Sequence, residues 1–287
     1  MASLATHFSA FLFFFPVGVR RLLFSSSLYL KSPSHYRSKI WYFSQPRWKN
    51  LDLYILMIAL PIASFSELFI FLSFSGHPTY RFAFLHQAFA VLIFWALLIL
   101  IIIQEYIGTS FISESYVFIF AGISFLVDYS VIGKGIAGLG AVVYGFLGGL
   151  TLVCAGACFY LSVKPTAFFA DFFLSSGMVF KGTWLLQSGL SLYTDAFGLK
   201  GCQKILPASP LEDIDVKCDL DEDSLRGITL MHFLFTVHGI LVMILSVGLF
   251  GLLASNWNLR WGETRGPLLT ELESSNMMMP LPEQELE

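Results

Sequence analysis

Seven apolar stretches, each about as long as a membrane crossing, occupy most of this 287-residue chain. Crossing about 30 Å of hydrocarbon takes roughly 20 mostly apolar residues, and a helix satisfies its own backbone hydrogen bonds where water is absent. Composition agrees, since only 13% of the residues are charged, against roughly 25% in soluble domains. The stretches cover residues 4–23, 51–74, 82–103, 107–132, 136–163, 167–193 and 228–254. We therefore predict an all-α polytopic bundle of seven transmembrane helices, forming one membrane domain over residues 1–254.

The segment between the first two stretches sets the predicted orientation. Short loops rich in Lys and Arg stay on the cytoplasmic side of a membrane. This segment has five basic residues and no acidic residue, and the basic residues are Lys31, Arg37, Lys39, Arg47 and Lys49. Seven crossings then place the amino terminus outside or in the lumen and the carboxyl terminus in the cytoplasm.

The first stretch lacks the layout of a cleavable signal peptide. A signal peptide carries its positive charges before its apolar core. Here no Lys or Arg precedes Phe8, and Arg20 and Arg21 follow the core. We interpret the stretch as a retained anchor, with both arginines reaching the lipid headgroups.

Two polar segments lie outside the stretches. The loop of residues 194–227 is acidic, is predicted to be extracytoplasmic, and contains Cys202 and Cys218. In an oxidising compartment a disulfide between these cysteines would close the loop. The acidic tail of residues 255–287 contains three prolines, and we predict that it is disordered and cytoplasmic.

Small residues at a spacing of four mark the fifth stretch. Ala141, Gly145 and Gly149 share one face of the predicted helix. Such faces let helix backbones approach closely in membranes. We therefore predict a packing seam at these residues and a central position for this helix.

Polar side chains inside the stretches define the candidate site. A charged residue at mid-bilayer costs about 2.5 to 3.5 kcal/mol on insertion scales. At about 1.5 Å of rise per residue, five polar side chains lie towards the outer ends of their helices: Glu67, His86, Asp128, Gln187 and His232. Lys181 and His238 lie deeper. We predict a polar cavity that opens outward and narrows towards these two, with Glu67 or Asp128 available to neutralise Lys181.

The same residues leave several roles open. A site with His86, His232 or His238 and one of the carboxylates would have acceptable ligand types for zinc. His232 and His238 are six residues apart, however, and do not share a helix face. Structural pairing and a functional pathway are alternative roles for Lys181 and His238. Nucleophile motifs and nucleotide fingerprints are absent, so we predict no catalytic residue and no cofactor.

The sixth stretch and the loop after it carry a resemblance to a known family. The motif is Phe180-Lys-Gly-Thr-Trp-Leu-Leu-Gln-Ser-Gly-Leu-Ser-Leu-Tyr193, followed by Lys200-Gly-Cys202, Lys217-Cys-Asp-Leu-Asp221 and His238. It resembles the plant branch of the transmembrane protein 45-like family, whose multipass members are grouped under a domain of unknown function. The residues that match the family pattern are Trp184, Gln187, Cys202, Cys218 and His238.

The resemblance implies a seven-span protein of the endomembrane system or plasma membrane, linked with stress and virus responses. The family commonly has Gln at the position of Lys181. We expect a non-enzymatic protein that acts by protein or lipid interaction, in trafficking or defence signalling. A transporter or channel using the polar cavity is the first alternative, and a metal-dependent membrane hydrolase is the second. The expected partners are the bilayer and a second copy or another membrane protein, and no nucleic acid.

Overall fold

The computed structural model describes residues 4–44, 50–73, 78–107, 112–133, 138–194, 201–202 and 218–276. These residues confirm the predicted all-α bundle. The long helices are α1 (Leu4–Lys31), α2 (Leu51–Ser73), α3 (Pro78–Ile107), α4 (Glu114–Val131), α5 (Gly138–Val163), α6 (Phe168–Tyr193) and α7 (Asp221–Asn276). A short 3-10 turn, η1 (Pro33–His35), follows α1.

Six of these helices, all except α6, are long and apolar enough to cross a membrane. Together they make the chain an integral membrane protein. The exception is the most deeply buried helix of the bundle, and it carries Asp171, Lys181 and several buried serines. Neighbouring helices, and not lipid, surround these polar side chains, so α6 does not need a uniformly apolar surface.

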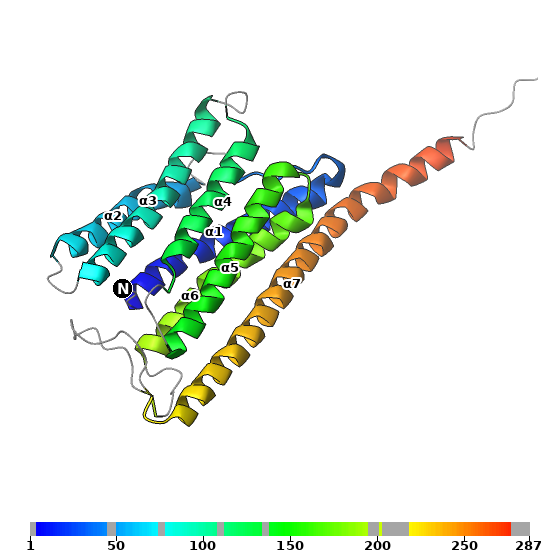
Figure 1. The fold of residues 1–287 in the computed structure, drawn as a ribbon. Coiled ribbons are helices and arrows are strands. Elements are labelled where there is room, and N and C mark those ends of the chain that lie inside the picture. Colours follow the sequence, from blue (N-terminus) through cyan, green and yellow to red (C-terminus); the bar gives the residue numbers. More distant parts are fainter. Residues whose placement is uncertain are drawn as a thin grey trace, which may run out of the picture.

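The bundle is built around the pair of α1 and α6, which run side by side in Figure 1. Glycines allow this close approach. A Cβ atom on Gly182 would lie 2.7 Å from the backbone nitrogen of Phe15, and one on Gly18 would lie 2.7 Å from that of Val179. Around this pair, α5 and α7 pack on α6, while α2 pairs with α3, α3 with α4, and α4 with α5. The closest backbone seam is therefore between α1 and α6, and not on α5.

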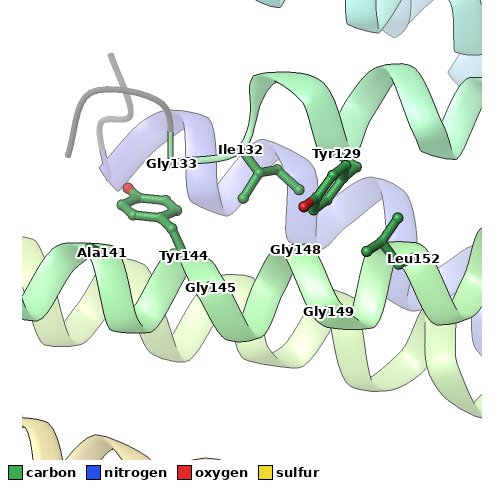
Figure 2. Close-up of a pocket in the computed structure, with 9 residues that line it drawn as sticks. All are labelled: Tyr129, Ile132, Gly133, Ala141, Tyr144, Gly145, Gly148, Gly149 and Leu152. Atoms are coloured by element: carbon green, nitrogen blue, oxygen red, sulfur yellow. The ribbon is translucent and has the colours of Figure 1, made fainter. Parts of the chain in front are cut away.

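No described helix of this chain packs on the predicted seam of α5. Ala141, Gly145 and Gly149 do share one face, as their spacing predicts (Figure 2). That face is open, because a Cβ atom on Gly145 or Gly149 would have no other heavy atom within 4 Å. Neighbouring helices contact other faces of α5, where Val143 and Leu147 are buried.

The ends of the chain also differ from the prediction. Helix α7 begins at Asp221 and continues to Asn276, so residues 255–276 of the predicted disordered tail are helical. Residues 277–287, and most of the predicted loop of residues 194–227, lie outside the described residues. At the described ends of that loop, Cys202 and Cys218 form a disulfide.

Candidate functional site

A buried ion pair joins three helices in the middle of the bundle. Lys181 of α6 donates hydrogen bonds to the Asp128 carboxylate of α4 and to Oγ1 of Thr151 on α5, the second at 2.7 Å. Lys181 is only 1% exposed. Its ammonium lies 4.4 Å from the ring centre of Phe14 and 5.4 Å from that of Phe125. A carboxylate and two aromatic faces thus take the place of water around this charge.

A second polar contact joins α7 to α6. Nδ1 of His238 is hydrogen-bonded to Oε1 of Gln187, and Nε2 lies 2.8 Å from Oγ1 of Thr183. The ring also packs near Phe180 and Trp184. Both ring nitrogens therefore have partners on α6, and the contact fixes the rotation of α7 against that helix.

The other predicted site residues lie in separate places. Nε2 of His86 is 3.1 Å from Oγ of Ser130, and the His232 ring packs edge-on against Phe146 at 4.7 Å. Glu67 is half-buried on α2, and its Oε2 has no hydrogen-bond partner among the described residues. The structure thus places Asp128, and not Glu67, against Lys181.

Three of the hollows that described residues line contain none of the seven predicted cavity residues. An apolar cavity of about 50 Å³ lies between α1, α3, α4 and α6. A groove of about 310 Å³ runs along α4 and α5, and an apolar groove of about 460 Å³ lies on α6 and α7. Among the described residues, Lys181 pairs with Asp128 and His238 with Gln187, and the outward-opening polar cavity stays a prediction.

The predicted zinc ligands are not assembled in the described residues. No group of three or more His, Cys, Asp or Glu side chains there could hold a metal ion. His86, His232 and His238 each face a different neighbour, namely Ser130, Phe146 and Gln187. The structure therefore offers the hydrolase hypothesis no ligand set.

Sequence reasoning missed a buried polar cluster at the opposite end of the bundle from the disulfide. Asp171, at the start of α6, is fully buried and lies 2.6 Å from the guanidinium of Arg21 on α1. Its Oδ2 accepts hydrogen bonds from the hydroxyls of Tyr36, Ser38 and Tyr42, the last two at 2.7 Å. We call these five residues the Asp171 cluster.

The cluster pins the segment after α1 across the end of the bundle. Nη1 of Arg21 donates to the carbonyl oxygens of Lys39 and Ile40, both at 2.8 Å. The prediction that Arg21 reaches the headgroups is wrong, because its side chain is buried. The guanidinium of Arg21 is paired with Asp171 and hydrogen-bonded to these carbonyl oxygens. Arg20 forms an ion pair with Asp52 at 2.9 Å. The segment that folds back supplies Arg21 with backbone carbonyl oxygens inside the protein, and α6 supplies the carboxylate.

A smaller polar contact lies at the other end of the bundle. Nε2 of His7, on α1, is 3.2 Å from the hydroxyl of Tyr144 on α5, and the His7 ring packs near Tyr193 of α6. His7 is buried. The His7 imidazole therefore joins three helices at this end. The position of His7 near the start of the chain was the one feature of the sequence that pointed to it.

The two cluster tyrosines predict a response to alkaline pH. Burial and the Asp171 carboxylate raise the pKa of Tyr36 and of Tyr42 above the ordinary value. Tyrosine in an unfolded chain ionises near pH 10, so above that pH the unfolded state has lost protons that the folded state keeps. Stability is therefore full below about pH 9 and falls as the pH rises beyond about 10.

We expect the unfolding midpoint in detergent to show this fall, and Tyr42→Phe to make it shallower. Tyr116→Phe is the matched control, because Tyr116 is 67% exposed. The measurement is thermal unfolding of the three proteins between pH 7 and pH 11. An alkaline slope that is the same in Tyr42→Phe and wild type would contradict the expected role of Tyr42.

Comparison with known proteins covers the second half of the bundle. Residues 109–251 match the model of a family of unknown function, DUF716. These residues include the Lys181–Asp128 and His238–Gln187 pairs and the disulfide, whereas Arg21, Tyr36, Ser38 and Tyr42 precede them. No curated protein matches the chain significantly. The chain is thus a multipass integral membrane protein that is similar, from α4 to α7, to the uncharacterised family DUF716.

Proposed function

We propose that the protein acts without catalysis, through lateral contacts with other transmembrane helices, as a trafficking or stress- and virus-response component like the plant transmembrane protein 45-like proteins that it resembles. The endomembrane system or the plasma membrane is the proposed location. The observation that carries this proposal is an open groove with glycines at its base. It lies on the outside of a bundle in which Lys181 is paired with Asp128 and Arg21 with Asp171.

The groove lies between the end of α4 and one face of α5 (Figure 2). Its volume is about 310 Å³. Tyr129 and Ile132 form one wall, and Gly145 and Gly149 have nothing packed on them. Interfaces between transmembrane helices are rich in such small residues, because van der Waals packing and not hydrophobicity drives their association. A helix from a second copy of the chain is the occupant to test first.

The test is to fill the groove with side chains. We expect wild-type protein in lipid nanodiscs or mild detergent to form dimers that chemical cross-linking captures. Gly145→Leu with Gly149→Leu is expected to weaken the dimer by roughly ten-fold or more, as the loss of about 1.4 kcal/mol of packing would do.

The matched control is Gly248→Leu with Gly251→Leu on α7, where an added Cβ atom also meets no atom within 4 Å. This variant adds the same bulk to a different lipid-facing surface and is expected to dimerise like wild type. Wild-type protein that is monomeric at all concentrations, or equal loss in both variants, would count against the groove as the contact surface.

Transport is the second candidate function, and the buried Lys181–Asp128 pair favours it. Intramembrane ionisable residues often mark ion or proton pathways. Reconstituted liposomes with a pH-sensitive dye separate the two functions. Lateral contact predicts no proton flux above that of protein-free liposomes, whereas transport predicts a flux that Asp128→Asn abolishes in folded protein.

A further inference from the structure

We propose that three basic side chains, Arg37, Lys39 and Lys164, form a site for the phosphate-bearing headgroup of an anionic membrane lipid. This inference goes beyond lateral helix contact and does not depend on the α4–α5 groove. The three residues, which we call the basic cluster, come from the segment after α1 and from the turn between α5 and α6. All three are exposed.

The Asp171 cluster forces the first two side chains outward. Tyr36 and Ser38 are buried because their hydroxyls donate to Asp171. In an extended segment, successive side chains point to opposite sides. Arg37 and Lys39, which flank Ser38, are therefore on the solvent side, and the contacts of Ser38 hold them there.

A backbone hydrogen bond brings the third cation to the same place. The N–H of Ser38 donates to the carbonyl oxygen of Pro165 at 2.7 Å. Lys164 precedes that proline and is exposed. This hydrogen bond fixes the segment of Arg37 and Lys39 beside Lys164, although more than a hundred residues separate them in the sequence. A mobile basic loop would not hold its side chains together in this way.

Three of the acidic side chains at this end of the bundle are already engaged. Asp171 is paired with Arg21 and Asp52 with Arg20. Glu114 accepts hydrogen bonds from the backbone N–H of Ile40 and from Gln104. Glu105, at the end of α3, is exposed. Among the described residues, none of the three basic side chains takes part in an ion pair.

The location suits a lipid headgroup. The basic cluster lies where α5 ends and α6 begins, at the depth of the headgroups when these helices cross a bilayer. In the predicted orientation this end faces the cytoplasmic leaflet, where anionic lipids concentrate. Each cation near such a surface strengthens binding by about a factor of five, and three cations by roughly a hundred-fold.

The experiment titrates full-length protein in neutral detergent with dioctanoyl phosphatidylinositol 4,5-bisphosphate and follows bound lipid by native mass spectrometry. Dioctanoyl phosphatidylcholine is the uncharged reference, and inositol trisphosphate is the headgroup without its chains. We expect wild type to prefer the anionic lipid over both, and to bind it less tightly as the salt concentration rises.

Two triple variants complete the test. The neutral variant Arg37→Gln/Lys39→Gln/Lys164→Gln is expected to bind the anionic lipid roughly a hundred-fold more weakly. The charge-conserving variant Arg37→Lys/Lys39→Arg/Lys164→Arg is expected to bind like wild type. Equal unfolding midpoints of all three proteins without lipid show that folding is intact. Undiminished binding by the neutral variant, or wild-type affinity for the free headgroup equal to that for the lipid, would overturn the proposal.

Discussion

Asp171→Leu is expected to lower the free energy of unfolding by about 3 to 5 kcal/mol. The change leaves the guanidinium of Arg21, which is 4% exposed, buried without its counter-charge. It also removes the acceptor for the hydroxyls of Tyr36, Ser38 and Tyr42. The measurement is denaturant or thermal unfolding in detergent, followed by tryptophan fluorescence.

A double variant separates lost charge balance from lost packing. Arg21→Met with Asp171→Leu replaces the pair by apolar side chains, and such replacements are often neutral or stabilising. We expect it to recover much of the stability that Asp171→Leu alone loses. Arg226→Gln is the control for an exposed pair, since the Arg226 side chain is 58% exposed beside Asp223, and should cost less than about 1 kcal/mol. A loss below 1 kcal/mol in Asp171→Leu would mean that the cluster does not hold this end of the bundle.

Asp128→Leu is expected to have an effect of similar size, about 3 to 5 kcal/mol. It leaves Lys181, whose side chain is 1% exposed, beside Thr151 and two aromatic rings without its counter-charge. Lys181→Met is expected to cost less, since the Asp128 side chain keeps 17% exposure and some hydration. The two variants should therefore differ in unfolding midpoint even though each breaks the same ion pair.

The control for this pair keeps the hydrogen bonds and removes both charges. Asp128→Asn with Lys181→Gln places an amide at each position. We expect this double variant to be more stable than either single variant. Equal midpoints for Asp128→Leu and Lys181→Met would show that the burial difference between the two side chains has no energetic effect.

Sequence reasoning succeeded where a single property decides the structure. Long apolar stretches predicted the helices because a bilayer leaves a spanning chain few other ways to satisfy its backbone. The depth of a residue along its helix follows from its position in the sequence. That counting put Lys181 near mid-bilayer, and Asp128 is the carboxylate that meets it in the structure.

The rotation of each helix could not be predicted in the same way. A helix that is apolar on all sides gives no periodic signal for which face is inside. The glycine face of α5 was therefore assigned to the interior, whereas Gly145 and Gly149 face an open groove. The burial of Asp171 could not be predicted, because nothing local in the sequence shows that Tyr36, Ser38 and Tyr42 fold back over it.

The pairing of α6 with its neighbours also bears on the order in which the chain enters the membrane. A helix with Lys181 near its centre is a poor candidate for insertion on its own, since one such charge costs about 2.5 to 3.5 kcal/mol. Its partner Asp128 belongs to α4, and Arg21, the partner of Asp171, belongs to α1. Both helices are synthesised before α6, so each charge of α6 meets an opposite charge that is already in place. Insertion of α6 is then a step of assembly, because the helices that are made first supply the polar partners that the charges of α6 need inside the membrane.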